Sequence, residues 1–152
     1  MTATTGDGTV AMVDAVVYAE LQQFYAAQMQ LLDDGAAEEW ARTFTPDGVF
    51  EQNVLPQPWQ GRHEIAAKMR GAVEKVAAKQ LERRHWIGMV TARPAGPGVV
   101  RTRYYATVVQ TPAGGSAEVH LSTRAEDVLV RSGDSWLVEH RSVWHDGSTA
   151  EG

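Results

Sequence analysis

The sequence contains no cysteine, so it can form no disulfide, thiolate nucleophile or sulfur-ligated metal site. It has no apolar run approaching the roughly 20 residues that a helix needs to cross a bilayer. Lys and Arg number 14 against 19 Asp and Glu, which argues against the clustered positive charge of a nucleic-acid surface. The opening MTATTGDGTVAMVD lacks the basic and apolar regions of a secretory signal. We therefore expect a soluble cytoplasmic protein that binds neither nucleic acid nor membrane.

The 152 residues fit one domain with a single core. Residues 1–12 are mostly small and polar and predict a disordered leader. Residues 13–146 form the predicted domain, and residues 147–152 a loose tail.

The first half of the domain predicts helices. Residues 13–32 carry apolar side chains at helical spacing over a wide arc, which indicates a largely buried helix. Asp33 and Asp34 close it, and Gly35 suits the left-handed position after a helix end. A short helix (AAEEWARTF), a turn at residues 45–48, a brief strand (GVFEQNV) and a Pro-rich loop at residues 55–61 follow. Residues 62–81 return to helical spacing.

The second half predicts four long strands, at residues 84–93, 98–110, 117–131 and 135–146, separated by the turn sequences PAGPG, TPAGG and SGD. Helices followed by a strand meander indicate an α+β fold. Because the first helix is too apolar for a surface position, a curved mixed or antiparallel sheet must wrap around the helices. We predict a cone-shaped α+β barrel, whose mouth is a natural small-molecule pocket.

The segment LLDDGAAEEWARTFTPDGVFEQN resembles the opening of nuclear transport factor 2-like domains, and RHWIGMV, EDVLVR and SGDSWLVEHRSV resemble their later strands in order. The resemblance covers residues 13–146 and is strongest to the SnoaL-like group. That group includes polyketide cyclases and relatives of scytalone dehydratase and of dioxygenase small subunits. It implies the fold predicted above, while the superfamily as a whole contains dehydratases, isomerases, cyclases, epoxide hydrolases and proteins without catalysis.

Scytalone dehydratase shares the strand pattern H-x-I-G, and the resemblance to it assigns its helix-end Asp to Asp33 and its strand His to His85. Its second His has no counterpart, since that position falls near Val109 or Gln110, and the tyrosine before its Asp is replaced by Leu32. In ketosteroid isomerase, the base would fall near Gln52, which cannot accept a proton, and the oxyanion-side acid near Asp127.

The residues themselves leave two interpretations of each candidate open. His85 shares a strand face with Ile87 and Met89, so it is either a base in an apolar cavity or a core histidine bonded to a backbone carbonyl. Asp33 stands at a helix C-terminus, where the dipole disfavours negative charge; it either binds His85 or simply marks the helix end. Asp127 lies on the apolar face of its strand and is either a second acid or the partner of Arg141.

Aromatic and soft apolar side chains, with one amide, are expected to line the cavity and bind substrate: Tyr25, Met29, Trp40, Phe50, Gln52, Trp59, Met69, Met89 and Tyr105. Trp59, in the Pro-rich loop, is a candidate lid. Tyr104 and Tyr105 point to opposite faces, so only one can reach the ligand. We interpret His120, His140 and His145 on the other strands as surface or rim residues. The arginine clusters Arg83-Arg84 and Arg101/Arg103 are interpreted as solvated strand faces. No recognised histidine spacing indicates a metal site.

These observations predict a cofactor-independent acid/base enzyme: a dehydratase, cyclase or isomerase acting on a hydrophobic small molecule of the polyketide or polycyclic type. His85, oriented by Asp33, would transfer the proton, and Asp127 or a tyrosine would stabilise the oxyanion. The alternative is a non-catalytic binding protein, like the small subunit of ring-hydroxylating dioxygenases. The family resemblance also implies a homodimer formed by the exposed sheet face, with Val108 or Val109 and Trp144 as anchors.

Overall fold

The computed structural model of the chain describes residues 11–149. The predicted leader therefore lies outside the described residues at positions 1–10, and the predicted tail at positions 150–152. The elements are α1 (Ala15–Asp33), α2 (Ala37–Ala41), β1 (Phe44–Gln52), β2 (Trp59–Gln60), α3 (Arg62–Ala78), β3 (Leu81–Pro94), β4 (Val99–Pro112), β5 (Glu118–Ser132) and β6 (Ser135–His145).

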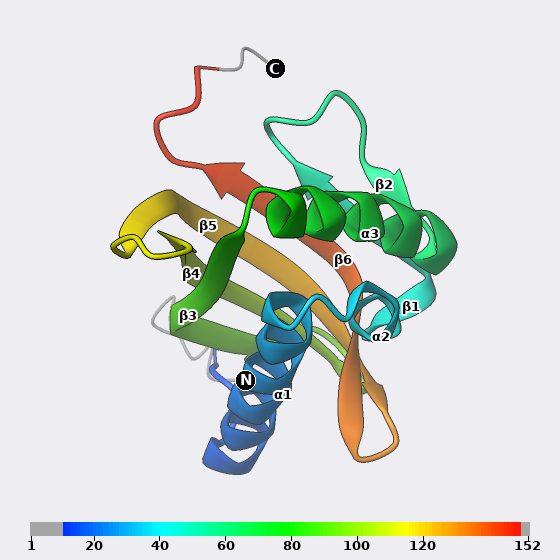
Figure 1. Cartoon of the computed structure of the whole chain (residues 1–152). Coiled ribbons are helices and arrows are strands. Elements are labelled where there is room, and N and C mark those ends of the chain that lie inside the picture. The colour runs from blue at the N-terminus through cyan, green and yellow to red at the C-terminus, as the bar shows by residue number, and fades with distance from the viewer. Residues whose placement is uncertain (1–10, 150–152) are drawn as a thin grey trace, which may run out of the picture.

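The predicted α+β architecture is confirmed. Six strands form one mixed sheet in the order β2-β1-β6-β5-β4-β3, in which β1 and β6 are parallel and the other pairs antiparallel. The sheet curves, and the three helices lie on one side of it (Figure 1). Strands β2 and β3 are the two edges and do not pair with each other, so the predicted barrel is not closed.

The segment between the second and third helices differs from the prediction. The turn expected at residues 45–48 lies inside β1, as an irregularity in register between Phe44 and Val49. Within the predicted Pro-rich loop, Trp59 and Gln60 pair with Phe50 and Val49 and form β2. A short β ladder therefore replaces part of the expected loop and gives Trp59 a fixed place beside β1.

Local sequence fixes both ends of α1. The Asp14 carboxylate caps the helix by accepting a hydrogen bond of 2.9 Å from the Val17 amide. At the other end, Gly35 has a φ of +77° and donates its amide to the Leu32 carbonyl at 3.1 Å. A Cβ on Gly35 would lie 3.1 Å from Val73 of α3, so the end of α1 passes close to α3. This tight exit holds Asp33 at the rim of the space between helices and sheet.

The core lies between the helices and the concave face of the sheet. Leu21 and Phe24 of α1, Trp40 of α2 and Ile65 of α3 belong to one buried cluster with Leu129 of β5 and its neighbours. Among the described residues, no helix has the length and apolar character needed to traverse a lipid bilayer. The helices cover this face only in part, and the space that they leave is the candidate site.

Candidate active site

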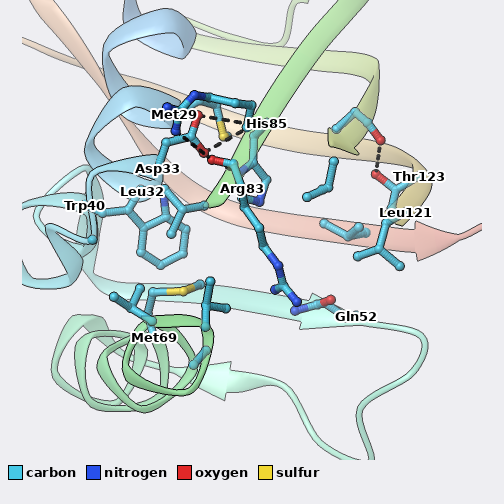
Figure 2. A pocket seen from close by; sticks show the side chains of 18 of the residues that line it. Met29, Leu32, Asp33, Trp40, Gln52, Met69, Arg83, His85, Leu121 and Thr123 are labelled. Carbon is cyan, nitrogen blue, oxygen red and sulfur yellow. Dashed lines mark hydrogen bonds and ion pairs between the residues drawn. The ribbon is translucent and has the colours of Figure 1, made fainter. Parts of the chain in front are cut away.

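A cavity of about 630 Å³ lies between α3, the C-terminal end of α1 and the inner face of the sheet. This volume lies within the range of small-molecule sites. Apolar side chains contribute most of the walls: Met29, Leu32, Trp40, Phe50, Trp59, Met69, Val73, Val76, Val108, Leu121 and Val143. The polar groups are few, and they come from the end of α1, from β3 and from β1 and β6 (Figure 2).

The structure brings Asp33 and His85 together. The Asp33 Oδ1 atom lies 2.6 Å from the His85 Nδ1 atom, and the backbone N–H of His85 donates to both carboxylate oxygens at 3.2 Å. Both side chains are largely buried, with exposed fractions of 10% for Asp33 and 22% for His85. Figure 2 shows the two residues joined where α1 meets β3.

The local fold explains this contact. β3 is an edge strand, so the outward-facing amide of His85 has no strand partner and is available to Asp33. The position of Asp33 at a helix C-terminus works against the helix dipole, and the contacts from the backbone and ring N–H groups of His85 offset that cost. The sequence prediction that Asp33 needs a partner and finds it in His85 thus agrees with the geometry.

The hydrogen bond assigns the tautomer of the imidazole. A carboxylate accepts, so His85 Nδ1 carries the proton that it donates to Asp33. In the neutral form of this tautomer, the Nε2 atom keeps a lone pair. His85 lines the cavity, so this arrangement can accept a proton from a ligand at Nε2 and stabilise the resulting imidazolium through Asp33.

Asp127 is placed behind the cavity wall, not in the cavity. Arg141 Nε and Nη2 donate to its two oxygens at 2.9 and 2.8 Å, and Tyr25 donates its hydroxyl at 2.8 Å. Tyr104 adds contacts of 3.2 Å. Of the two interpretations left open by the sequence, the pairing with Arg141 is the one that the contacts support, because the carboxylate is completely enclosed by donors.

Burial keeps the two tyrosines of this network protonated. Desolvation, assisted by the negative charge of Asp127, raises the pKa of Tyr25 well above its ordinary value. Desolvation also raises the pKa of Tyr104, although the Arg141 guanidinium opposes the shift. Both hydroxyls therefore act as hydrogen-bond donors to Asp127 over the whole physiological range.

A second polar group lies at the other end of the cavity. His145 Nε2 lies 2.7 Å from Gln52 Oε1, and both residues line the cavity. The amide oxygen can only accept, so Nε2 is the donor. Desolvation and the neighbouring His120 lower the pKa of His145. This pair can offer the Gln52 amide N–H₂ group to a ligand oxygen.

Arg83 also lines the cavity, which corrects its interpretation as a solvated strand residue. It lies two residues before His85 and so faces the same side of β3. Its Nε donates to Gln110 Oε1 at 2.9 Å, and its Nη2 lies 3.2 Å from His120 Nε2. Partial desolvation lowers the pKa of Arg83 from its ordinary value.

Most of the predicted substrate-binding residues line the cavity: Met29, Trp40, Phe50, Gln52, Trp59 and Met69. Trp59 stacks on Phe50, with ring centroids 5.2 Å apart, and is part of a wall held by the β1–β2 pairing. The indole N–H of Trp40 is buried and has no acceptor within the described residues.

Three of the predicted substrate-binding residues are placed elsewhere. Tyr25 is buried and bonded to Asp127, so it supports the wall from behind. Met89 is 79% exposed because a register shift between Gly88 and Thr91, with a φ of +54° at Met89, interrupts the alternation of β3. Tyr105 is 52% exposed on the outer face, whereas Tyr104 is the tyrosine that faces inward.

Three polar residues that line the cavity were interpreted otherwise from the sequence: Arg83 and Arg84 as solvated strand residues, and His145 as a surface or rim residue. The signal for Arg83 was present, since residues 83 and 85 share strand parity. The signal for His145 was absent, because its role depends on β1 lying parallel to β6. In the described part of the chain, no group of three or more His, Asp or Glu side chains is arranged to hold a metal ion.

The fold places the chain in the class of nuclear transport factor 2-like α+β domains, with a cavity between the helices and the sheet. The model of the SnoaL-like domain family matches residues 14–142, and the chain belongs to this family. No curated protein sequence matches the chain.

Several solved structures are similar to the chain over nearly their whole length. Aln2 from a Streptomyces species is 31% identical, with a TM-score of 0.81 over 90% of this chain and 95% of that one. ActVI-ORFA from Streptomyces coelicolor is 32% identical, with a TM-score of 0.81 over 89% and 98%. A protein from Catenulispora acidiphila, solved in complex with S-DNPA, is 37% identical, with a TM-score of 0.77 over 88% and 96%.

Proposed function

We propose that this protein is an acid/base enzyme that moves a proton on a hydrophobic small molecule of the polyketide or polycyclic type, as a dehydratase, cyclase or isomerase. The observation that carries the proposal is the Asp33–His85 pair at 2.6 Å in the wall of an apolar cavity. A binding protein needs the cavity, but it does not need an oriented imidazole with a free nitrogen.

In this mechanism, Asp33 holds the Nδ1 proton of His85, and Nε2 removes a proton from a carbon beside a carbonyl or from a hydroxyl of the substrate. The imidazolium that forms is stabilised by Asp33 and returns the proton to the leaving oxygen or to the product. Such a group contributes about 10²–10⁴ in rate. The apolar walls position the substrate and exclude water.

Two further findings support the proposal. The walls are chiefly aliphatic and aromatic, with the Phe50–Trp59 stack on one side, which suits a flat hydrophobic substrate. A relative of 37% identity was solved in complex with S-DNPA. We assign the oxyanion contact to Gln52, whose amide faces the cavity beside His145, in place of the sequence-based candidate Asp127, because the Asp127 oxygens are already occupied.

A neutral probe tests the base without knowledge of the natural substrate. A base in an apolar pocket removes the C3 proton of 5-nitrobenzisoxazole, the N–O bond breaks, and a coloured 2-cyano-4-nitrophenolate is released. We expect the wild-type protein to accelerate this reaction and His85→Gln to lose about 10²-fold or more of the acceleration. The control is His63→Gln, which changes an exposed histidine on α3.

Equal rates for the wild type and His85→Gln, with both variants folded by circular dichroism, would contradict the base role. They would favour the alternative class, a non-catalytic binding domain that uses the same cavity.

A further inference from the structure

The Arg83 guanidinium lines the cavity and has no carboxylate partner among the ion pairs of the described residues. Its protein contacts are with neutral acceptors, the Gln110 side-chain oxygen at 2.9 Å and the His120 ring nitrogen at 3.2 Å. Within residues 11–149, no carboxylate forms an ion pair with Arg83. The adjacent acid, Glu82, also lines the cavity, but its side chain is 74% exposed and lies 3.9 Å from Arg84.

Arg141, which is fully buried, provides a comparison, because its charge and its N–H groups have partners in the protein. Arg141 donates to both oxygens of Asp127 and to Gln28, and its charge is matched by a carboxylate. Arg83, by contrast, is half-buried in the cavity wall with only two N–H groups bonded to described residues. A guanidinium has five N–H donors, so several remain for a ligand.

The surroundings of Arg83 reinforce this imbalance. His120 accepts from Arg83 and must be neutral to do so; desolvation and the charge of Arg83 lower the pKa of His120, against a raising influence of Glu118. Desolvation and His120 lower the pKa of His145, against a raising influence of Asp146. A neutral His120 accepts a hydrogen bond from Arg83 but brings no negative charge, so neither of the two protein contacts of the guanidinium matches its charge.

We propose that Arg83 binds a carboxylate carried by the substrate, so that the substrate class is an aromatic or polycyclic acid; this inference rests on the proposed function. One guanidinium matches one negative charge, and its planar N–H groups fit the two oxygens of a carboxylate. Figure 2 shows the Arg83 side chain extending from β3 toward the end of the cavity where Gln52 is labelled, away from the Asp33–His85 pair.

The spacing on β3 sets the geometry of that substrate. Residues 83 and 85 face the same side of the strand, and their Cα atoms are separated by about 6.6 Å along it. The acid arm and the carbon that loses its proton therefore lie at least one ring width apart. Arg83 then fixes which end of a flat molecule meets His85 and excludes the reversed orientation.

The test compares 2-naphthylacetate with 2-naphthylacetamide, two probes that differ in charge, by isothermal titration calorimetry at neutral pH. We expect the wild-type protein to bind the acid about 10- to 100-fold more tightly than the amide, as for a charge-assisted hydrogen-bond pair. Arg83→Gln is expected to bind the two equally, and Arg83→Lys to keep part of the preference. Arg103→Gln, an exposed arginine on β4, is the matched control and keeps the full preference.

A wild-type protein that binds the acid and the amide equally, or an Arg83→Gln variant that keeps the preference, overturns the proposal. Failure of the wild-type protein to bind the acid overturns it as well. The neutral benzisoxazole carries no carboxylate, so its turnover by the wild-type protein is measured separately from the preference for the acid. Turnover with no acid preference thus rejects the Arg83 proposal alone, whereas an acid preference without His85-dependent turnover rejects the proposed enzyme and leaves an acid-binding protein.

Discussion

The Asp33 carboxylate at the C-terminal end of α1 and the His85 imidazole on edge strand β3 meet at 2.6 Å, although 52 residues separate them in the chain. The backbone N–H of His85 contacts the same carboxylate, so the contact fixes the strand as well as the ring. The free imidazole nitrogen is thereby held at a constant position relative to the cavity walls.

Replacing Asp33 tests whether this orientation matters for proton transfer. Asp33→Asn keeps the size of the side chain but removes the charge that stabilises the imidazolium and selects the Nδ1–H tautomer. We expect it to reduce the rate of benzisoxazole cleavage by about 10²-fold or more while the protein stays folded. The measurement is the initial rate at saturating probe, with Asp47→Asn, an exposed acid on β1, as the control. A rate within twofold of the wild type would show that the carboxylate does not assist His85.

The Asp127–Arg141 pair is predicted to stabilise the fold and to have no direct part in proton transfer. Asp127→Asn leaves the fully buried Arg141 without a matching charge, since its exposed fraction is 2%. Breaking such a pair costs about 3–5 kcal/mol of the free energy of unfolding. Chemical denaturation of Asp127→Asn beside Glu126→Gln, an exposed neighbour on β5, measures the difference. A loss below about 1 kcal/mol would mean that water reaches the pair and screens it.

Acidification is predicted to destabilise the protein through His120 and His145. Desolvation lowers the pKa of both histidines in the folded protein below the ordinary 6.5, which they keep in the unfolded chain. At a pH between the folded-state and the unfolded-state pKa, the unfolded chain therefore binds more protons than the folded one. Their contribution to stability is therefore complete above about pH 6.5 and is lost as the pH falls through the folded values. Urea unfolding at about pH 7 and pH 5 should show a smaller decrease for His120→Gln than for the wild type. An identical decrease would assign the acid sensitivity to other groups.

The homodimer expected from the sequence stays a prediction. Of the expected anchors, Val108 is 4% exposed and faces the core, which leaves Val109 and Trp144. Trp86 on β3, Tyr105 on β4 and Val119 on β5 are exposed on the outer side of the sheet, at 69%, 52% and 68%. If a second copy covers this face, sedimentation velocity will give a dimer for the wild type and a monomer for Trp86→Glu. A wild-type protein that is monomeric at micromolar concentration would contradict the predicted homodimer.

The sequence by itself determined the order and type of the main elements, because its signals are local. The wide apolar arc of residues 13–32, Gly35 after the helix and the turns between the strands all depend on neighbours along the chain. The family resemblance offered the contact of Asp33 with His85 as one of two interpretations, and the type of side chain predicted six of the residues that line the cavity. The alternation of β3 predicted that Met89 faces the cavity with His85, and this was wrong. A bulge between Gly88 and Thr91, which no single residue signals, turns the side chains that follow it to the opposite side of the sheet.

Only the tertiary structure decided which charges are matched. The sequence left the role of Asp127 open and assigned Arg83 to a solvated strand face. Folding gave Asp127 an arginine and two tyrosines as partners, and it gave Arg83 neutral acceptors beside an open cavity. The pairing of Gln52 with His145 likewise follows from the parallel contact of β1 with β6. Ion pairing depends on distance in space, and the curvature of the sheet and the packing of the helices set those distances.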